Sequence, residues 1–224
     1  MIPRTLSSTA TAVPAVSESI EPATGPALWL VRHGESTWNI AGICQGHNDD
    51  AELTERGLRQ AAEAADGFRG REIRAIYASD LCRARQTAAA FAAVLGLPVR
   101  TDARLRERSF GVLEGTPLAS VDPALTGVAD GLVFDPDIRP PGGESVRDFY
   151  LRAAAFADAL AAELREADDA PPGDVLAIAH GGTLRVLDAY LHGVPVDQMT
   201  WRPVSNATTL RIAEFGTQPR GGNR

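Results

Sequence analysis

The chain has 224 residues, 44% of them hydrophobic, and its formal net charge at pH 7 is −7. This length suits one domain or two small ones, and it can bury a sizeable core. The negative charge argues against a general binding surface for nucleic acid or anionic membranes, although it leaves room for a local cationic pocket. The sequence contains no lysine, which excludes a P-loop and a Schiff-base lysine. No apolar run approaches the roughly 20 residues that span a bilayer.

The two ends of the chain differ in composition from its middle. Residues 1–26 are rich in Ser, Thr, Ala and Pro, which predicts a disordered N-terminal tail. This segment lacks the cationic start and the continuous apolar stretch of a signal peptide. The whole chain has two cysteines, which are too few for a disulfide framework. We therefore expect a cytoplasmic protein with one folded domain at 27–215 and a flexible C-terminal tail at 216–224.

Between these ends, apolar runs alternate with longer segments of helical spacing. The runs predict strands at 27–31, 73–78, 174–180 and 208–215. The longer segments predict helices at 54–68, 81–96, 145–167 and 181–193. Thr54 and the pair Ser79-Asp80 are the expected N-terminal caps, and Gly96 is an expected C-terminal cap. The alternation predicts an α/β fold, a three-layer sandwich in which helices cover both faces of a mostly parallel sheet.

Two of the predicted strands end in a histidine that is followed by glycine. His33 follows the first strand, directly after Arg32, and His180 ends the third. Parallel strands bring their carboxyl ends to one edge of the sheet, where open α/β sheets bind their ligands. The strand at 73–78 ends at the same edge and is followed by Arg83, one turn into its helix. We therefore expect two histidines and two arginines to meet in an active site.

Five sequence motifs support this interpretation. They are RHGES at 32–36, SDLCRARQTA at 79–88, LRERSFGVLEG at 105–115, PGGES at 141–145 and AHGGTLR at 179–185. In these residues and in their order, the chain resembles the histidine phosphatase superfamily, in the branch related to cofactor-dependent phosphoglycerate mutase. The resemblance covers roughly 27–215.

The resemblance implies a role for each candidate residue. His33 would be the nucleophile, attacking phosphorus through one ring nitrogen while a backbone carbonyl or a carboxylate holds the other. Arg32 and Arg83 would bind the phosphoryl oxygens through planar guanidiniums, and His180 would hydrogen-bond the same oxygens. Glu107 would protonate the leaving group and then activate water. The sequence leaves open whether flanking arginines lower its pKa or burial raises it. The implied lining of the phosphate pocket is Asn39, Gln45, Gly46 and Gly181.

The segment between Gly115 and Arg139 would cover this pocket, judging by its place in the family fold. It is short, acidic and free of cations, whereas the family's mutases resemble one another in basic residues that hold a substrate carboxylate. We therefore expect a phosphatase of the histidine acid phosphatase type, acting on a small phosphate ester with a neutral or hydrophobic leaving group. A phosphoglycerate mutase and a catalytically silent phosphate-binding module are the alternatives. The sequence shows no metal-ligand pattern, so we expect no metal and no cofactor, and it leaves a homodimer open.

Overall fold

The structure is a computed structural model, and it describes residues 26–126, 128–129, 132–133, 135–166, 172–213 and 215–216. Apart from Pro26 and Gly216, the predicted tails at 1–26 and 216–224 lie outside the described residues. Within the described residues, no helix is both long enough and apolar enough to cross a membrane.

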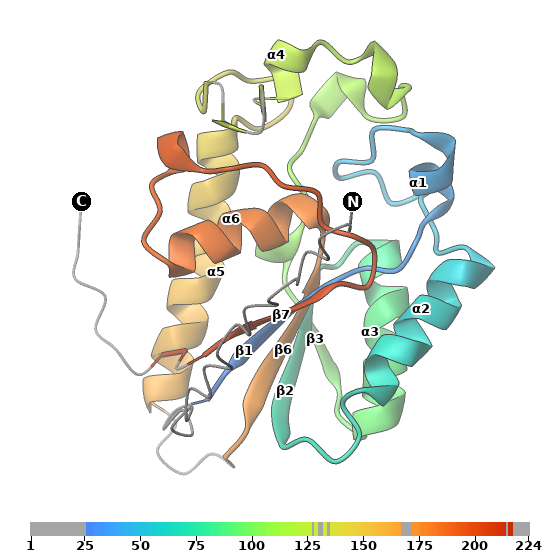
Figure 1. The fold of residues 1–224 in the computed structure, drawn as a ribbon, viewed down its shortest axis with the longest axis vertical. Coiled ribbons are helices and arrows are strands. Elements are labelled where there is room, and N and C mark those ends of the chain that lie inside the picture. Colours follow the sequence, from blue (N-terminus) through green and yellow to red (C-terminus); the bar gives the residue numbers. More distant parts are fainter. Residues whose placement is uncertain are drawn as a thin grey trace, which may run out of the picture.

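A mostly parallel sheet of five strands forms the centre of the molecule (Figure 1). The strand order is β3-β2-β6-β1-β7, and only β7 runs antiparallel to its neighbour. The bounds of these strands are Leu28–Arg32 for β1, Ile73–Ala78 for β2, Val99–Thr101 for β3, Asp174–Ala179 for β6 and Thr209–Ile212 for β7. The four predicted strands are confirmed, whereas the short edge strand β3 was not predicted.

Helices pack on both faces of the sheet, as the three-layer prediction requires (Figure 1). The longer helices are α2 (Glu55–Asp66), α3 (Cys82–Leu95), α5 (Val146–Glu166) and α6 (Gly181–Leu191). Helices α5 and α6 bury one apolar cluster against the sheet, and α2 and α3 bury a second cluster on the opposite face. The shorter elements are α1 (Thr37–Ala41), α4 (Pro123–Thr126), β4 (Val128–Ala129) and β5 (Leu132–Val133).

Two of the three predicted helix caps are confirmed. The Thr54 hydroxyl accepts the N–H of Gly57 at 2.9 Å, and Gly96 ends α3 in the left-handed region at φ +68°. The Ser79-Asp80 prediction is wrong, because α3 begins after Leu81 and this cap position makes no side-chain hydrogen bond. Ser79 is instead buried, and its hydroxyl contacts His180.

The sheet register places His33 and His180 directly after paired residues at the carboxyl ends of two neighbouring strands. Arg32 at the end of β1 pairs with Ala179 at the end of β6, and the N–H of His33 donates to the Ala179 carbonyl at 2.9 Å. The end of β2 joins them, since the N–H of Ser79 donates to the carbonyl of Ile178 at 2.9 Å. The segment that contains α4 lies above this edge of the sheet (Figure 1). Three strand ends therefore meet beneath one covering segment.

Candidate active site

His33 lies at the centre of the candidate site, and only 3% of its surface is exposed. Its Nδ1 lies 2.7 Å from the carbonyl oxygen of Gly34. Because a carbonyl can only accept, Nδ1 carries the proton, and the lone pair of the neutral imidazole is on Nε2. Burial, followed by the charges of Arg83 and Arg32, holds the pKa of His33 well below 6.5. The side chain is therefore neutral near pH 7, with Nε2 available as a nucleophile.

His180 is fully buried beside His33, with the two ring centroids 5.1 Å apart. Its Nε2 lies 2.9 Å from the hydroxyl oxygen of Ser79, which also accepts the N–H of Leu81 at 3.3 Å. When the Ser79 hydroxyl donates to Nε2, the proton of the neutral ring is on Nδ1. That Nδ1 is buried and has no hydrogen-bond partner among the described residues.

Two arginines approach the histidines from different elements. Arg83, on α3, is 1% exposed and donates to the carbonyls of Gly46 at 2.8 Å and Asn48 at 2.9 Å. Arg32, at the end of β1, donates from Nη1 to the carbonyl of Val204. Burial lowers the pKa of both groups, to about 10 for Arg83, and the negative charge of Glu107 partly opposes that shift. Both guanidiniums therefore remain charged at neutral pH.

Three buried nitrogens at the site have no hydrogen-bond partner within the described part of the chain. They are Nε of Arg32, Nε of Arg83 and Nδ1 of His180. A buried donor without an acceptor is costly, and such groups in a folded protein call for an explanation. The charges of Arg83 and Arg32 lower the pKa values of both His33 and His180, so the two guanidiniums lie near both rings. An oxyanion such as a phosphoryl group is the kind of acceptor that these donors can bind.

Glu107 enters the site from the loop that follows β3. Its Oε2 accepts the N–H of Gly182 at 2.9 Å, and its Oε1 accepts the N–H of Arg108 at 3.0 Å. The first of these donors lies at the N-terminal end of α6, where the helix dipole favours negative charge. The carboxylate is thus fixed in position at the wall of the neighbouring cavity.

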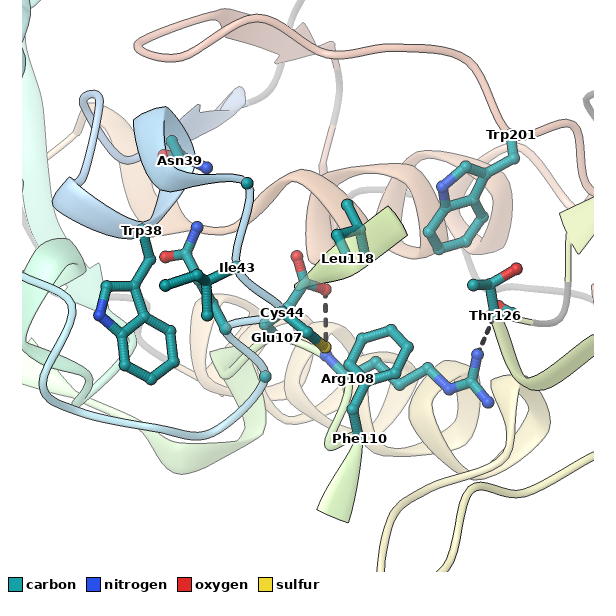
Figure 2. A pocket seen from close by; sticks show the side chains of 13 residues that line it. Trp38, Asn39, Ile43, Cys44, Glu107, Arg108, Phe110, Leu118, Thr126 and Trp201 are labelled. Atoms are coloured by element: carbon teal, nitrogen blue, oxygen red, sulfur yellow. Dashed lines mark hydrogen bonds between the residues drawn. The ribbon is translucent and has the colours of Figure 1, made fainter. Parts of the chain in front are cut away.

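A cavity of about 220 Å³ opens beside Glu107 (Figure 2). Figure 2 shows Trp38 and Trp201 at opposite sides of the view, with Glu107 between them. Arg108 is the only cation in the described lining, and it is 2% exposed. Its guanidinium donates to backbone carbonyls of Glu144, Thr126 and Ile138. The large apolar side chains of the lining are Trp38, Ile43, Phe110, Leu118 and Trp201.

Asn39 and Gln45, which the resemblance assigned to the phosphate pocket, line this cavity. The Oδ1 atom of Asn39 accepts the N–H of Ser36 at 3.0 Å, and Oε1 of Gln45 accepts from the Ser36 hydroxyl at 3.0 Å. Both amide oxygens are therefore engaged. Their NH2 groups, which have no partner among the described residues, are the donors that the two side chains can offer to a ligand.

Gly46 and Gly181 each contact one of the two arginines or leave space for it. The carbonyl of Gly46 accepts from Arg83, and its φ of +47° favours glycine. At Gly181, a Cβ atom would lie 3.3 Å from Nε of Arg32, so glycine leaves room for that guanidinium. The two glycines thus help to place the cations.

The sequence matches the histidine phosphatase superfamily (branch 1) over residues 28–220. The chain belongs to this superfamily. Among its relatives is "Probable phosphoglycerate mutase GpmB" of Yersinia pestis (strain Pestoides F), which is 38% identical over 187 residues, or 83% of each chain.

Solved structures of other superfamily members have the same fold. A mycobacterial glucosyl-3-phosphoglycerate phosphatase, in a complex with VO3, is 33% identical and superposes with a TM-score of 0.72, covering 84% of this chain and 90% of that one. A protein from Thermus thermophilus is 29% identical, with a TM-score of 0.61 and coverages of 83% and 92%. The family's enzymes include phosphatases and mutases, and both kinds of name occur among these relatives.

In this family member, the covering segment does not present its described aspartates to the cavity. Asp122 accepts the N–H of Ala124 at 2.9 Å, and Asp137 pairs with Arg147 at 2.7 Å. Neither these two nor Asp135 lines the cavity, and the side chain of Asp130 lies outside the described residues. The segment contributes Leu118 and Thr126 to the lining. Among its described residues, the segment therefore contributes one leucine and one threonine to the lining, and no aspartate.

Three residues that support the site were not predicted as such. Ser79 contacts His180, Asn206 contacts the backbone of His33, and Arg152 donates to the carbonyl of Glu107 at 2.9 Å. Ser79 belongs to a motif that the resemblance covered, so a signal was present but was interpreted as a helix cap. Asn206 and Arg152 lie outside the motifs, in a loop and on the long helix α5.

Proposed function

We propose that this protein is a metal-independent phosphomonoesterase that hydrolyses a small phosphate ester through a phosphohistidine on His33. The observation that carries the proposal is the set of unpartnered buried nitrogens around that histidine. Phosphoryl transfer spreads negative charge over the equatorial oxygens, so fixed cationic and neutral donors stabilise the transition state. The two buried arginines supply the positive charge that bound metal ions supply in other phosphatases.

In the first step, Nε2 of His33 attacks phosphorus and the bond from phosphorus to the ester oxygen breaks. The leaving oxygen takes a proton from Glu107. In the second step, water attacks the phosphohistidine while Glu107 takes its proton, and the P–N bond breaks to release inorganic phosphate. Glu107 suits both steps because its carboxylate is held in position by two backbone N–H groups and lies at the cavity wall.

The cavity favours a substrate whose leaving group is neutral or apolar. Its walls are largely aromatic and aliphatic, and the donors of Arg108 are already engaged by backbone carbonyls. A second anionic group on the substrate would find no free cation among the described lining residues. This supports a phosphatase over a phosphoglycerate mutase, which must hold a carboxylate as well as a phosphate.

The experiment is a phosphate-release panel in the presence of a chelator, with His33→Ala and the exposed His192→Ala as matched variants. We expect wild type and His192→Ala to hydrolyse neutral and aryl monoesters, and we expect no turnover from His33→Ala. Quenching with alkaline detergent and labelled substrate should trap a phosphoprotein in wild type only, and its label should be lost on acidification. Activity lost on chelation, or turnover retained in His33→Ala, would overturn the mechanism.

The same panel tests the substrate class. A preference for phosphoglycerates, including glucosyl-3-phosphoglycerate, over neutral monoesters would overturn the proposal for the leaving group. Conversion of 3- to 2-phosphoglycerate with a bisphosphate primer would identify a mutase. The silent binding module predicts phosphate binding with no phosphohistidine in any variant.

A further inference from the structure

The segment from Val204 to Thr208, which precedes β7, encloses the end of β1. The N–H of Arg32 donates to the carbonyl of Thr208 at 2.9 Å, and the N–H of Ala207 donates to the carbonyl of His33 at 3.2 Å. Val204 accepts from the Arg32 guanidinium. The candidate nucleophile and its neighbouring cation therefore share one supporting segment.

Ala207 adopts a backbone conformation that alanine rarely takes. Its φ of +57° lies in the left-handed region, and it is the only non-glycine residue with positive φ in the described part of the chain. Strained residues of this kind persist where the surrounding structure requires them, and they gather at functional sites. Here the unusual turn directs the Ala207 N–H and the Asn206 side chain towards the same backbone.

The Asn206 amide reaches three acceptors around His33. Its Nδ2 lies 3.2 Å from the carbonyl oxygen of His33, 3.3 Å from that of Gly34 and 3.1 Å from Oδ1 of Asn39. The Gly34 oxygen is the same atom that accepts the Nδ1–H of His33. One amide group therefore contacts both the acceptor that orients the imidazole and the amide oxygen of a cavity residue.

We propose that Asn206 is a positioning residue that orients His33 and Asn39 together. By holding the Gly34 oxygen, it keeps the Nδ1 proton in place and the Nε2 lone pair directed at phosphorus. By engaging Oδ1 of Asn39, it turns that side chain's NH2 group towards the cavity. This inference rests on the proposed phosphohistidine function, and Asn206 itself makes no contact with the reacting atoms.

The test compares Asn206→Ala, Asn206→Asp and Asn206→Ser with Ser205→Ala, an exposed neighbour in the same segment. We expect the rate constant of histidine phosphorylation to fall about 10- to 100-fold in Asn206→Ala, because misorientation of a reacting group carries losses of that size. Asn206→Asp replaces the donor by a charged acceptor, and we expect it to lower this rate constant at least as much. Asn206→Ser keeps one donor, and we expect a smaller decrease in the rate constant than in Asn206→Ala. We expect KM to change by less than the rate constant, and Ser205→Ala to match wild type.

A second readout separates this inference from the proposed function. In the free enzyme, the 15N shifts of the His33 ring report how fully Nδ1 carries the proton, whether or not the enzyme turns over. We expect a single Nδ1–H form in wild type and a mixture of tautomers in Asn206→Asp. Unchanged ring shifts in a folded variant, or phosphorylation within twofold of wild type, would overturn the positioning role. Absence of a phosphohistidine in wild type would count against the proposed function alone.

Discussion

The backbone N–H of Gly182 donates to Oε2 of Glu107 at 2.9 Å, and a Cβ atom on Gly182 would lie 2.1 Å from Oε1 of the same carboxylate. Glycine at this position thus provides a hydrogen-bond donor and the space that the carboxylate fills. The first turn of α6 therefore dictates where the proposed acid and base is held.

Replacing Gly182 by alanine should displace Glu107 without touching the phosphate donors. We expect kcat to fall about 100-fold, because a displacement of about 1 Å at a reacting group has an effect of this order. The affinity for inorganic phosphate should change much less. Steady-state kinetics and phosphate titration measure the two quantities, and Gly67→Ala, at a right-handed C-terminal cap, is the control. Wild-type turnover in Gly182→Ala would show that Glu107 does not act from this position.

Burial of the two histidines predicts a loss of stability in mild acid. The pKa values of His33 and His180 are held well below 6.5, mainly by burial, so the unfolded chain binds protons that the native state does not. The contribution of the two neutral histidines to the free energy of unfolding is therefore fully present above pH 6.5, and it decreases as the pH falls below that value. Each histidine contributes a slope of about 1.4 kcal/mol per pH unit in this window. His47, whose pKa burial also lowers, acts in the same direction.

Urea denaturation at pH 7.5, 6.5 and 5.5 measures this dependence. The carboxylates with lowered pKa values, such as Asp80 and Glu144, start from values of 3.8 and 4.5 and add their own losses mainly below this window. His180→Gln should reduce the slope between pH 6.5 and 5.5 relative to wild type. Equal stability at pH 7.5 and 5.5 would contradict the assignment of two buried neutral histidines.

The convergence at the sheet edge could be predicted from the sequence because it depends on local patterns. The run ending at Val31 and the run ending at Ala179 are continuous and apolar, which identifies two buried parallel strands. Parallel pairing then brings His33 and His180 to one edge, whatever lies between them in the chain. The same argument placed Arg83, because it lies one turn into the helix that follows the predicted strand at 73–78.

The supporting contacts could not be predicted in this way. Asn206 lies 173 residues from His33 along the chain, and no repeat or spacing in the sequence joins them. The lining of the cavity depends on side-chain direction, which composition does not give: the acidity of the covering segment suggested an acidic rim, yet Leu118 and Thr126 face the cavity. Ser79 was assigned to a helix end because serine favours such positions, and burial at the end of β2 gave it a histidine partner instead.

Removal of the Ser79 hydroxyl should weaken phosphate binding through His180. When the Ser79 hydroxyl donates to Nε2, it fixes the His180 proton on Nδ1, the atom that would then donate to an oxyanion, and Ser79→Ala removes this donor. We expect Ser79→Ala to lower the affinity for inorganic phosphate and kcat/KM by about tenfold, which is the effect of one buried hydrogen bond. Calorimetric titration measures the affinity, and the exposed Ser120→Ala is the control. Identical phosphate affinity in both variants would refute the role of Ser79.

Arg152 and Glu144 form a support beneath the Glu107 loop. Arg152 donates to Glu144 at 2.7 and 2.8 Å, and also to the carbonyls of Arg104, Arg106 and Glu107 at 2.8 to 3.0 Å. Both side chains of the pair are only 19% exposed. Arg152→Met would remove one donor from each of three carbonyls and would leave the carboxylate of Glu144 without its charge partner, with the N–H of Ser109 still donating to it. We expect a loss of about 2–4 kcal/mol in the free energy of unfolding, since removing one partner from a largely buried pair is costly.

Arg152→Met should also lower kcat, because the loop that carries Glu107 loses its hydrogen bonds to α5. The matched control is Arg147→Met, on the same helix, whose ion pair with Asp137 is exposed to solvent and should contribute little to stability. Denaturation midpoints and initial rates at saturating substrate measure the two effects. If Arg152→Met and Arg147→Met are equally stable and equally active, the loop is held by its own backbone hydrogen bonds and the support from α5 is dispensable.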